Sequence, residues 1–385
     1  MKKKPNLLIV SDTKMFCAEN KWYAFNSVVK ELDVFVDLFD KITWIGFEEM
    51  GSSPDSTLLE IKYSQVKCVG LKKSGGNSFI AKFKLIFHIP IYLVTIFWYS
   101  RSADIVHSRG PSSPMFCALV LSFFQYKTKW WFKYANNWND INAAASWRLQ
   151  RRLLIFNNKS IVTVNGIWDK MPSHILSFEN PCLEESIIPY SDDKNHMLNE
   201  GCQLLFVGRL ELKKGLLTVI DAVESNQSKT PIERIEIFGD GNDKDFFLTR
   251  IGKSILAQKF FSHGLCSKEE VLTRMRNSDF LLLPSVASEG FPKVLAEAWA
   301  SGCIPVVSDV SCVSQYAVDG VNSFVWRIGG IETYSDVLNR ALNTDIEDLI
   351  DIRSAGCEMC SYFTYSRYKQ RIEQEIIQKF FVRVD

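Results

Sequence analysis

The sequence lacks an apolar run long enough to cross a bilayer as a helix. The run from Leu85 to Tyr99 has 15 residues and is interrupted by His88 and Pro90, whereas a spanning helix needs about 20. The first ten residues contain three lysines but only a four-residue apolar run, which is too short for the core of a secretory signal. We therefore expect a cytoplasmic protein.

A cysteine framework and a strong net charge are also absent. The 10 cysteines are scattered, and Cys357 and Cys360 form a CxxC pair without a second pair, so a zinc site is not expected. The formal net charge is only +1, which argues against a dedicated nucleic-acid binder.

The charge is nevertheless unevenly distributed along the chain. Residues 1–192 carry 23 basic and 17 acidic side chains, whereas the remainder carries 22 and 27. Positions 62–103 contain seven basic residues and no acidic one. This basic stretch surrounds the apolar run Leu85 to Tyr99, which is either a buried core helix or a helix lying in a membrane interface with Trp98 and Tyr99 at headgroup level.

Short apolar runs alternate with longer segments of helical periodicity, a pattern typical of parallel sheets. At 385 residues the chain fits two domains. A polar segment at 186–201 predicts the linker, so we expect Rossmann-like domains at 1–192 and 193–360 that face each other across a cleft. The expected strands are 6–10, 42–45, 105–107, 129–134, 161–164, 203–207, 235–238, 280–283 and 305–307, and 22–39 is expected to be a helix.

Two carboxylates lie eight residues apart, across a Gly-Pro turn that is expected to open a helix. Glu289 is expected on the loop, beside free backbone N–H groups that favour an anion, and Glu297 on the helix. If the helix begins after Glu289, both acids can border one cleft. Such a site suits a phosphorylated ligand, although a capped surface helix with ordinary acidic residues is equally compatible with the spacing.

Two basic residues follow the strand that is expected to end at Val207. Arg209 and Lys214 offer a planar fork and a point charge for a phosphate. The turn after the next strand contains Gly239 and Gly241, which allow the backbone to approach a ligand, but Lys244 stands where a dinucleotide fingerprint has its third glycine. An oxidoreductase is therefore disfavoured. Asp243 is expected to cap a helix, as is Ser267 with Glu270 at capping-box spacing.

Together these segments resemble the carboxyl-terminal domain of glycosyltransferase family 4, whose members are retaining sugar-nucleotide enzymes of the GT-B fold. The resemblance covers residues 203 to about 330. It is carried by FVGRLELKKG, by IFGDGN, by SEGFPKVLAEAWASGCIPVV and by the Asp319 to Val325 segment. It implies an α/β fold with two facing Rossmann-like domains and a final helix, 361–385, that packs back on the first domain.

The resemblance also implies roles for individual residues. Arg209 and Lys214 would neutralise the diphosphate of a UDP- or GDP-sugar, Glu289 would approach the transferred sugar, and Glu297 would bind the ribose. Front-face transfer with retention and without a metal is implied; a double displacement with Glu289 as nucleophile stays open. The other implied donor contacts are Gly208, Gly239, Gly241, Gly290, Phe291, Pro292, Lys293 and Leu295.

The first half departs from the family pattern. A Gly-Gly turn is common after the first strand in the family, whereas Ser11 and Asp12 stand here, and Asn136 lies near the place of a common histidine. Asn136 and His107 are candidates for acceptor or sugar contacts, although a core histidine is an alternative for His107.

We therefore expect a metal-independent enzyme that transfers a sugar from a nucleoside diphosphate to a lipid-linked glycan acceptor in cell-surface polysaccharide synthesis. It would lie in the cytoplasm, peripherally at the inner face of the membrane. The alternatives are a nucleotide-sugar epimerase or hydrolase of similar fold, and a catalytically silent partner of another transferase.

Overall fold

The computed structural model describes residues 4–49, 58–73, 79–187, 201–288 and 290–381, with side chains in the helix that begins at Phe79 described from residue 87 onward. It divides into two compact units. Unit 1 comprises Met1–Glu179 with Tyr365–Asp385, and unit 2 comprises Asn180–Thr364. The chain therefore leaves unit 1 once and returns to it at its end, whereas the sequence-based boundaries lie at 192 and 360.

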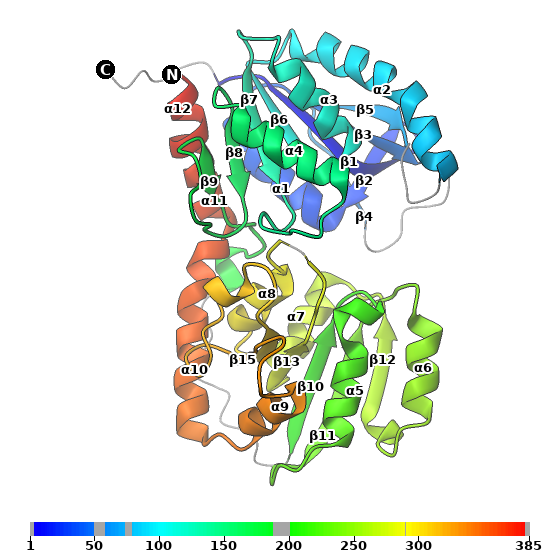
Figure 1. Cartoon of the computed structure of the whole chain (residues 1–385), viewed down its shortest axis with the longest axis vertical. Helices are drawn as coiled ribbons and strands as arrows, with labels where there is room; N and C mark the ends of the chain where they lie inside the picture. The colour runs from blue at the N-terminus through cyan, green and yellow to red at the C-terminus, as the bar shows by residue number, and fades with distance from the viewer. Residues whose placement is uncertain (1–3, 50–57, 74–78, 188–200, 289, 382–385) are drawn as a thin grey trace. The chain divides into compact units, whose positions relative to one another are not determined.

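Unit 1 is built on a sheet of nine described strands (Figure 1). The order β5-β3-β1-β6-β7-β8-β9 is parallel throughout, and β2 and β4 extend it as an antiparallel branch. The strands are β1 (Leu7–Ala18), β2 (Lys21–Phe25), β3 (Ile42–Glu49), β4 (Leu58–Glu60), β5 (Val66–Lys72), β6 (Ile105–Gly110), β7 (Lys129–Tyr134), β8 (Ile161–Val164) and β9 (Ile175–Ser177).

Helices pack on both faces of this sheet because successive strand residues point to opposite faces. Leu8 and Val10 belong to a core formed with α2, α3 and α4, whereas Leu7 and Ile9 belong to a core formed with α1 and the end of the chain. The helical segments are α1 (Asn26–Leu38), α2 (Phe79–Ser100), α3 (Ser113–Ser122), α4 (Ala145–Phe156), α11 (Tyr365–Arg371), the π-helical η6 (Ile372–Gln378) and α12 (Lys379–Phe381).

Unit 2 has a six-stranded sheet that is parallel throughout, with the order β12-β11-β10-β13-β14-β15. This is the doubly wound Rossmann order, in which the chain reverses its winding direction between β10 and β13. The strands are β10 (Cys202–Val207), β11 (Ile232–Phe238), β12 (Phe260–Gly264), β13 (Phe280–Leu283), β14 (Ile304–Ser308) and β15 (Phe324–Trp326).

The helices of unit 2 also form two layers. One face of the sheet packs against α5, α6, α9 and α10, and the other against α7 and α8. The helical segments are η1 (Glu185–Ile187), η2 (Leu212–Lys214), α5 (Leu216–Glu224), α6 (Lys244–Gly252), η3 (Ala257–Lys259), α7 (Lys268–Arg276), α8 (Lys293–Ala300), η4 (Val313–Gln315), α9 (Tyr334–Leu342), α10 (Ile346–Met359) and η5 (Cys360–Phe363).

The predicted α/β class with two doubly wound sheets is confirmed. One expected element is wrong: the helix predicted from residue 22 begins at Asn26, because Lys21–Phe25 forms β2. Glu19 and Asn20 have φ values of 51° and 62°, and two consecutive positive φ values reverse the chain into a hairpin with β1.

The helical caps differ in how well they follow the sequence. Ser267 accepts a hydrogen bond from the Glu270 N–H at 3.2 Å, as predicted. Asp243 is the N-cap residue of α6, and its Oδ2 accepts the Leu212 N–H at 2.9 Å rather than an N–H of the helix. Asp243 thus stands at the start of a helix as predicted, and its side chain also holds the loop that follows β10.

Candidate functional site

A cavity of about 250 Å³ opens where the winding of unit 2 reverses. Ligands of open parallel sheets bind outside the carboxyl ends of the strands at this switch point. The lining comes from the ends of β10, β13 and β14 and from the start of α8, and includes Gly208, Lys214, Ser285, Gly290, Pro292 and Lys293. The two loops that the sequence singled out as anion-binding thus border one cavity.

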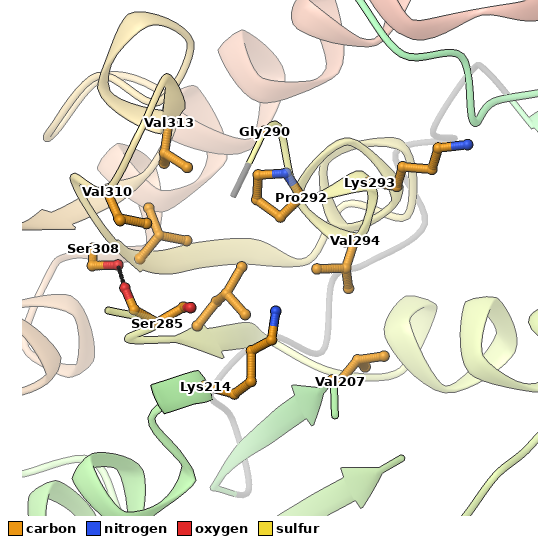
Figure 2. A pocket seen from close by; sticks show the side chains of 13 residues that line it. Val207, Lys214, Ser285, Gly290, Pro292, Lys293, Val294, Ser308, Val310 and Val313 are labelled. Atoms are coloured by element: carbon orange, nitrogen blue, oxygen red, sulfur yellow. Dashed lines mark hydrogen bonds between the residues drawn. The ribbon is translucent and has the colours of Figure 1, made fainter. Parts of the chain in front are cut away.

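Lys214 supplies the cation of this cavity. It is only 8% exposed, and Figure 2 shows its side chain rising from η2 into the middle of the lining residues. The following residue, Gly215, has φ 89°, and a Cβ there would lie 2.3 Å from the Pro284 carbonyl oxygen. Glycine is therefore required for η2 to lie against the end of β13, which places the Lys214 ammonium at the cavity.

Hydrogen bonds hold the loop after β13 against the same turn. The Val286 N–H donates to the Lys213 carbonyl at 2.9 Å. On the other side, the Ser308 hydroxyl donates to the Ser285 carbonyl at 2.5 Å, as drawn in Figure 2. These contacts fix the rim of the cavity.

The start of α8 forms the opposite wall. Pro292 stands before the first helical residue, and the unpaired N–H groups of a helix N-terminus favour an anion. Gly290 and Lys293 line the cavity, but the Lys293 side chain extends away from the other lining residues in Figure 2. Glu289, predicted to approach the transferred sugar, lies outside the described residues.

Arg209 borders a different cavity from Lys214. It lines a second cavity of about 190 Å³ together with Gly208 and Gly239. Its side chain is 59% exposed and pairs with Glu211 Oε1 at 2.8 Å. The two predicted phosphate cations therefore border neighbouring cavities that share Gly208, and Arg209 is the solvent-exposed one.

The glycine turn after β11 brings two loops into close contact. Gly239 has φ 138°, and a Cβ there would lie 1.9 Å from the Gly208 carbonyl oxygen. A Cβ at Gly241 would lie 2.5 Å from the Leu210 carbonyl oxygen. Both glycines are therefore required for the turn to approach the loop that carries Arg209.

Glu297 projects from α8 toward the start of α7. Its Oε1 lies 2.9 Å from the Lys268 Nζ, and the same ammonium donates to the Cys182 carbonyl at 2.6 Å. Lys268 was not among the predicted site residues. The only sequence signal for it was its place directly after the predicted helix cap at Ser267.

Two apolar residues of the predicted donor site, Phe291 and Leu295, are core residues of unit 2. Phe291 stacks on Phe363 with ring centroids 4.4 Å apart. Leu295 is fully buried, and its N–H donates to the Pro292 carbonyl at 3.0 Å. The Leu295 side chain thus has no surface to offer a ligand, and both residues fix the position of α8.

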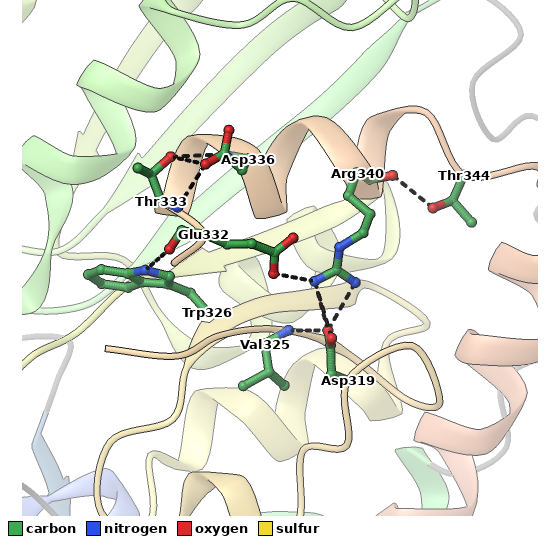
Figure 3. A network of polar contacts seen from close by, with 8 residues as sticks. All are labelled: Asp319, Val325, Trp326, Glu332, Thr333, Asp336, Arg340 and Thr344. Carbon is green, nitrogen blue, oxygen red and sulfur yellow. Dashed lines mark hydrogen bonds and ion pairs between the residues drawn. The ribbon is translucent and has the colours of Figure 1, made fainter. Parts of the chain in front are cut away.

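The segment after β14 also holds α8. The Trp299 indole N–H donates to the Asn322 carbonyl at 2.9 Å. Asp319 in turn accepts the Val325 N–H at 2.8 Å and pairs with Arg340 at 3.1 Å, within the network shown in Figure 3. The predicted Asp319 to Val325 motif therefore supports the helix that carries Glu297.

In unit 1 the two candidate acceptor contacts differ. His107 is fully buried and contacts Phe35, and its ring lies against Trp131 with the centroids 3.7 Å apart. Burial holds the pKa of His107 well below the ordinary value. A fully buried ring cannot touch an acceptor, so the core-histidine alternative fits. Asn136 is half-buried and follows the end of β7, which leaves it available as a contact.

A buried ionic group that the sequence did not reveal lies beside His107. The Glu31 carboxylate, 2% exposed, pairs with Lys133 at 2.9 Å and also with Arg109. The Lys133 ammonium further donates to the Tyr368 hydroxyl at 3.4 Å. This group ties α1, β6 and β7 to α11, and its four members were unremarkable in the sequence because their partners are distant along the chain.

The comparison with protein families concerns mainly unit 2. The model described as glycosyl transferases group 1 matches residues 192–357. The predicted resemblance is thereby confirmed at this level for that part of the chain, whereas the assignment to family 4 stays a prediction.

Two curated relatives from Mycobacterium tuberculosis align over a similar length. Glycogen synthase is 30% identical over 120 residues, which are 31% of this chain and 28% of that protein. Phosphatidyl-myo-inositol mannosyltransferase is 30% identical over 122 residues, 31% of this chain and 32% of that protein. The chain thus spans less than half the length of either relative.

Solved structures share the fold over nearly the whole chain. Sucrose-phosphate synthase from Thermosynechococcus elongatus has a TM-score of 0.76 at 14% identity, covering 99% of this chain and 100% of that chain. Anabaena HepE in complex with UDP-glucose has a TM-score of 0.66 at 15% identity, covering 97% and 100%. These neighbours establish the GT-B fold of two Rossmann-like units.

Proposed function

We propose that this protein is a glycosyltransferase that transfers a sugar from a nucleoside diphosphate sugar to a glycan acceptor. The observation that carries the proposal is the cavity at the switch point of unit 2, where the Lys214 ammonium faces the N-terminus of α8. Both groups stabilise negative charge, and a diphosphate that leaves a sugar develops such charge in the transition state. The names of the relatives and the UDP-glucose bound to HepE support a nucleotide-sugar donor.

Each site residue has a role in this proposal. Lys214 and the α8 amides hold the departing diphosphate, Arg209 contacts it from the exposed side, and Glu297 binds the ribose. Glu289 acts on the transferred sugar. The reaction proceeds with retention at the anomeric carbon, in which the departing phosphate takes the proton of the acceptor hydroxyl.

No metal is required in this proposal, because the cationic side chains and amide dipoles stabilise the leaving group. Among the described residues, no group of three or more His, Cys, Asp and Glu side chains is arranged as metal ligands would be. Transfer that persists in a chelating buffer would support the proposal, and transfer that requires an added divalent cation would contradict it.

A thermal-shift screen with UDP, GDP, ADP and CDP sugars identifies the donor. A ligand present at 100 times its Kd stabilises the folded state by about 2.7 kcal/mol. The donor that stabilises the protein is then offered radiolabelled to candidate glycan acceptors. Stabilisation with label incorporation is the expected result; release of free sugar or an epimer without an acceptor favours the epimerase or hydrolase alternative, and stabilisation without any turnover favours the silent partner.

We further propose that the acceptor is lipid-linked and that α2 lies on the inner face of the membrane. The helix has two faces: Tyr92 and Ile96 are fully buried, whereas the opposite face is apolar and exposed. This exposed face consists of Phe87, Ile91, Val94, Phe97 and Trp98, which are between 43% and 68% exposed. The buried face is that of a core helix, and we assign the exposed apolar face to the membrane interface.

Basic residues border the exposed face. The Lys67 ammonium lies 5.3 Å from the centroid of the Tyr99 ring, and the Arg101 guanidinium lies 6.0 Å from that of Phe97. Basic side chains beside exposed apolar and aromatic ones suit a surface of anionic lipids. The contact that we propose is peripheral. None of the helices in the described part of the chain has the length and hydropathy needed to cross a bilayer.

Flotation with liposomes tests this membrane contact. The wild-type protein is expected to float with vesicles that contain anionic lipid, and the variant Phe87→Ser with Trp98→Ser is expected to stay at the bottom of the gradient. Both side chains are more than 60% exposed, so the variant should unfold like the wild type. Equal flotation of the two proteins would contradict the assignment of this face.

A further inference from the structure

Lys268 forms an ion pair with Glu297, the carboxylate that binds the ribose in the proposed function. Its ammonium has two partners, Glu297 Oε1 at 2.9 Å and the Cys182 carbonyl at 2.6 Å. The Lys268 and Glu297 side chains are 22% and 16% exposed. An ion pair at this depth is screened less than a surface pair, and the loss of one partner leaves the other charge partly desolvated.

Both partners of Lys268 are held in place by the surrounding fold. Glu297 lies on α8, which is anchored through Trp299 and Asn322. Cys182 donates its N–H to the Phe363 carbonyl at 2.9 Å. Lys268 itself is the first residue of α7, directly after the capping Ser267. Three separate elements therefore fix the position of one ammonium group.

The ion pair engages only one oxygen of the carboxylate. Glu297 Oε1 faces Lys268, and within the described ranges Oε2 has no hydrogen-bond partner. A carboxylate oxygen accepts hydrogen bonds from hydroxyl groups. With its rotamer fixed through Oε1, the carboxylate can present Oε2 to a ligand without losing side-chain entropy on binding.

We propose that Lys268 is a positioning residue that orients Glu297 for the ribose hydroxyls of the donor. This inference rests on the proposed function. It adds a reason why the protein would bind a nucleoside diphosphate, which carries a ribose, more tightly than a diphosphate without one. Lys268 does not touch the phosphates in this account. Its whole contribution to affinity passes through Glu297.

Calorimetric titrations of four proteins test the proposal: the wild type, Lys268→Met, Glu297→Gln and the double variant. Each is titrated with inorganic pyrophosphate and with whichever of UDP, GDP, ADP and CDP binds the wild type most tightly. Lys268→Met is expected to weaken the nucleoside diphosphate about 10-fold, the size of one charge-assisted hydrogen bond, and to leave pyrophosphate within about twofold. In the Glu297→Gln background, Lys268→Met is expected to change neither affinity further.

Lys259→Met is the matched control. Lys259 also donates to a backbone carbonyl, that of Ile232 at 2.6 Å. It precedes β12, however, and so lies at the amino ends of the strands, whereas the cavity lies at their carboxyl ends. Its loss should leave both affinities unchanged. An unfolding curve in urea establishes that each variant is folded before it is titrated.

Two results would overturn the positioning role. Equal weakening of pyrophosphate and nucleoside diphosphate would make Lys268 a phosphate cation, and a loss that persists in the Glu297→Gln background would separate it from the carboxylate. A wild-type protein that binds neither ligand would instead overturn the proposed function itself.

Discussion

Neutralising Lys214 should weaken the binding of the donor diphosphate far more than neutralising its neighbour Lys213. Lys214→Met keeps the length of the side chain while removing its charge. Lys214 is only 8% exposed and its ammonium lies in the cavity of unit 2, whereas the Lys213 side chain is 58% exposed and pairs with Glu211 at 3.5 Å. The two substitutions thus change the net charge equally and differ in position alone.

The expected magnitude follows from the kind of contact that is lost. A hydrogen bond to a charged group contributes about 1.5–3 kcal/mol, and about 1.4 kcal/mol corresponds to a tenfold change in affinity. Lys214→Met should therefore raise the Kd of the nucleoside diphosphate by roughly 10- to 150-fold, and Lys213→Met by no more than about threefold, through long-range attraction that salt screens. Isothermal titration calorimetry measures both values.

The salt dependence of binding distinguishes a direct contact between Lys214 and the diphosphate from long-range attraction by the charge of the protein. The deficit of Lys214→Met relative to the wild type should persist at high ionic strength, because the group lies within the cavity and is poorly screened. Equal deficits for the two variants, or a Lys214→Met protein that binds like the wild type, would refute the assignment of Lys214.

Three further predictions concern other parts of the chain. Glu289→Gln should abolish sugar transfer while leaving the Kd of the nucleoside diphosphate within about threefold; undiminished turnover would refute its catalytic role. Gly239→Ala should lower the free energy of unfolding, measured in urea, by about 3 kcal/mol or more, because the new methyl group meets a backbone oxygen. Gly264 has φ 70° and open space around it, so Gly264→Ala should lower the same quantity by only about 1–2 kcal/mol. Equal losses would contradict the close approach of Gly239 to the Gly208 carbonyl oxygen. The hydrogen bond from Arg250 lowers the pKa of Glu224 from 4.5 to about 2, so the ion pair stabilises the protein above pH 4.5 and loses this effect as the pH falls toward 2. The Glu224→Gln variant should therefore be less stable than the wild type by about 1 kcal/mol or less at neutral pH, and this difference should vanish in acid. A difference in stability that does not depend on pH would be inconsistent with the ion pair.

The alternation of apolar runs and helical segments was sufficient to predict both parallel sheets. Strands buried on both faces, such as Lys129–Tyr134 and Phe280–Leu283, have the bounds that their apolar runs predict. The missed strands have weaker patterns: Val66–Lys72 contains two lysines and lies at the edge of its sheet, where partly exposed residues are tolerated. The hairpin at Glu19 and Asn20 was missed because a turn with two positive φ values ordinarily contains glycine.

The candidate site was predictable to the extent that it is encoded locally. Gly208, Lys214 and Gly290 each lie in a loop directly after a strand or before a helix, and parallel topology gathers such loops at one edge of the sheet. The partner of Glu297 was not predictable, because Lys268 lies 29 positions away and only the packing of α7 beside α8 brings them together.

Side-chain direction was the other feature that the sequence could not supply. Lys293 is part of the same motif as Glu297 and borders the cavity, yet its side chain extends away from the other lining residues. His107 was expected at the end of its strand, but β6 continues to Gly110, and alternate residues of a strand face opposite sides. It faces Phe35 on α1 and is buried there.

A crystal structure with the tightest-binding nucleoside diphosphate sugar tests the central claim most directly. The account predicts the diphosphate in the cavity of unit 2, within hydrogen-bond distance of the Lys214 ammonium and the first amides of α8, with the ribose against Glu297. A ligand bound elsewhere on the protein, or a diphosphate in this cavity with the Lys214 side chain turned toward solvent, would contradict it.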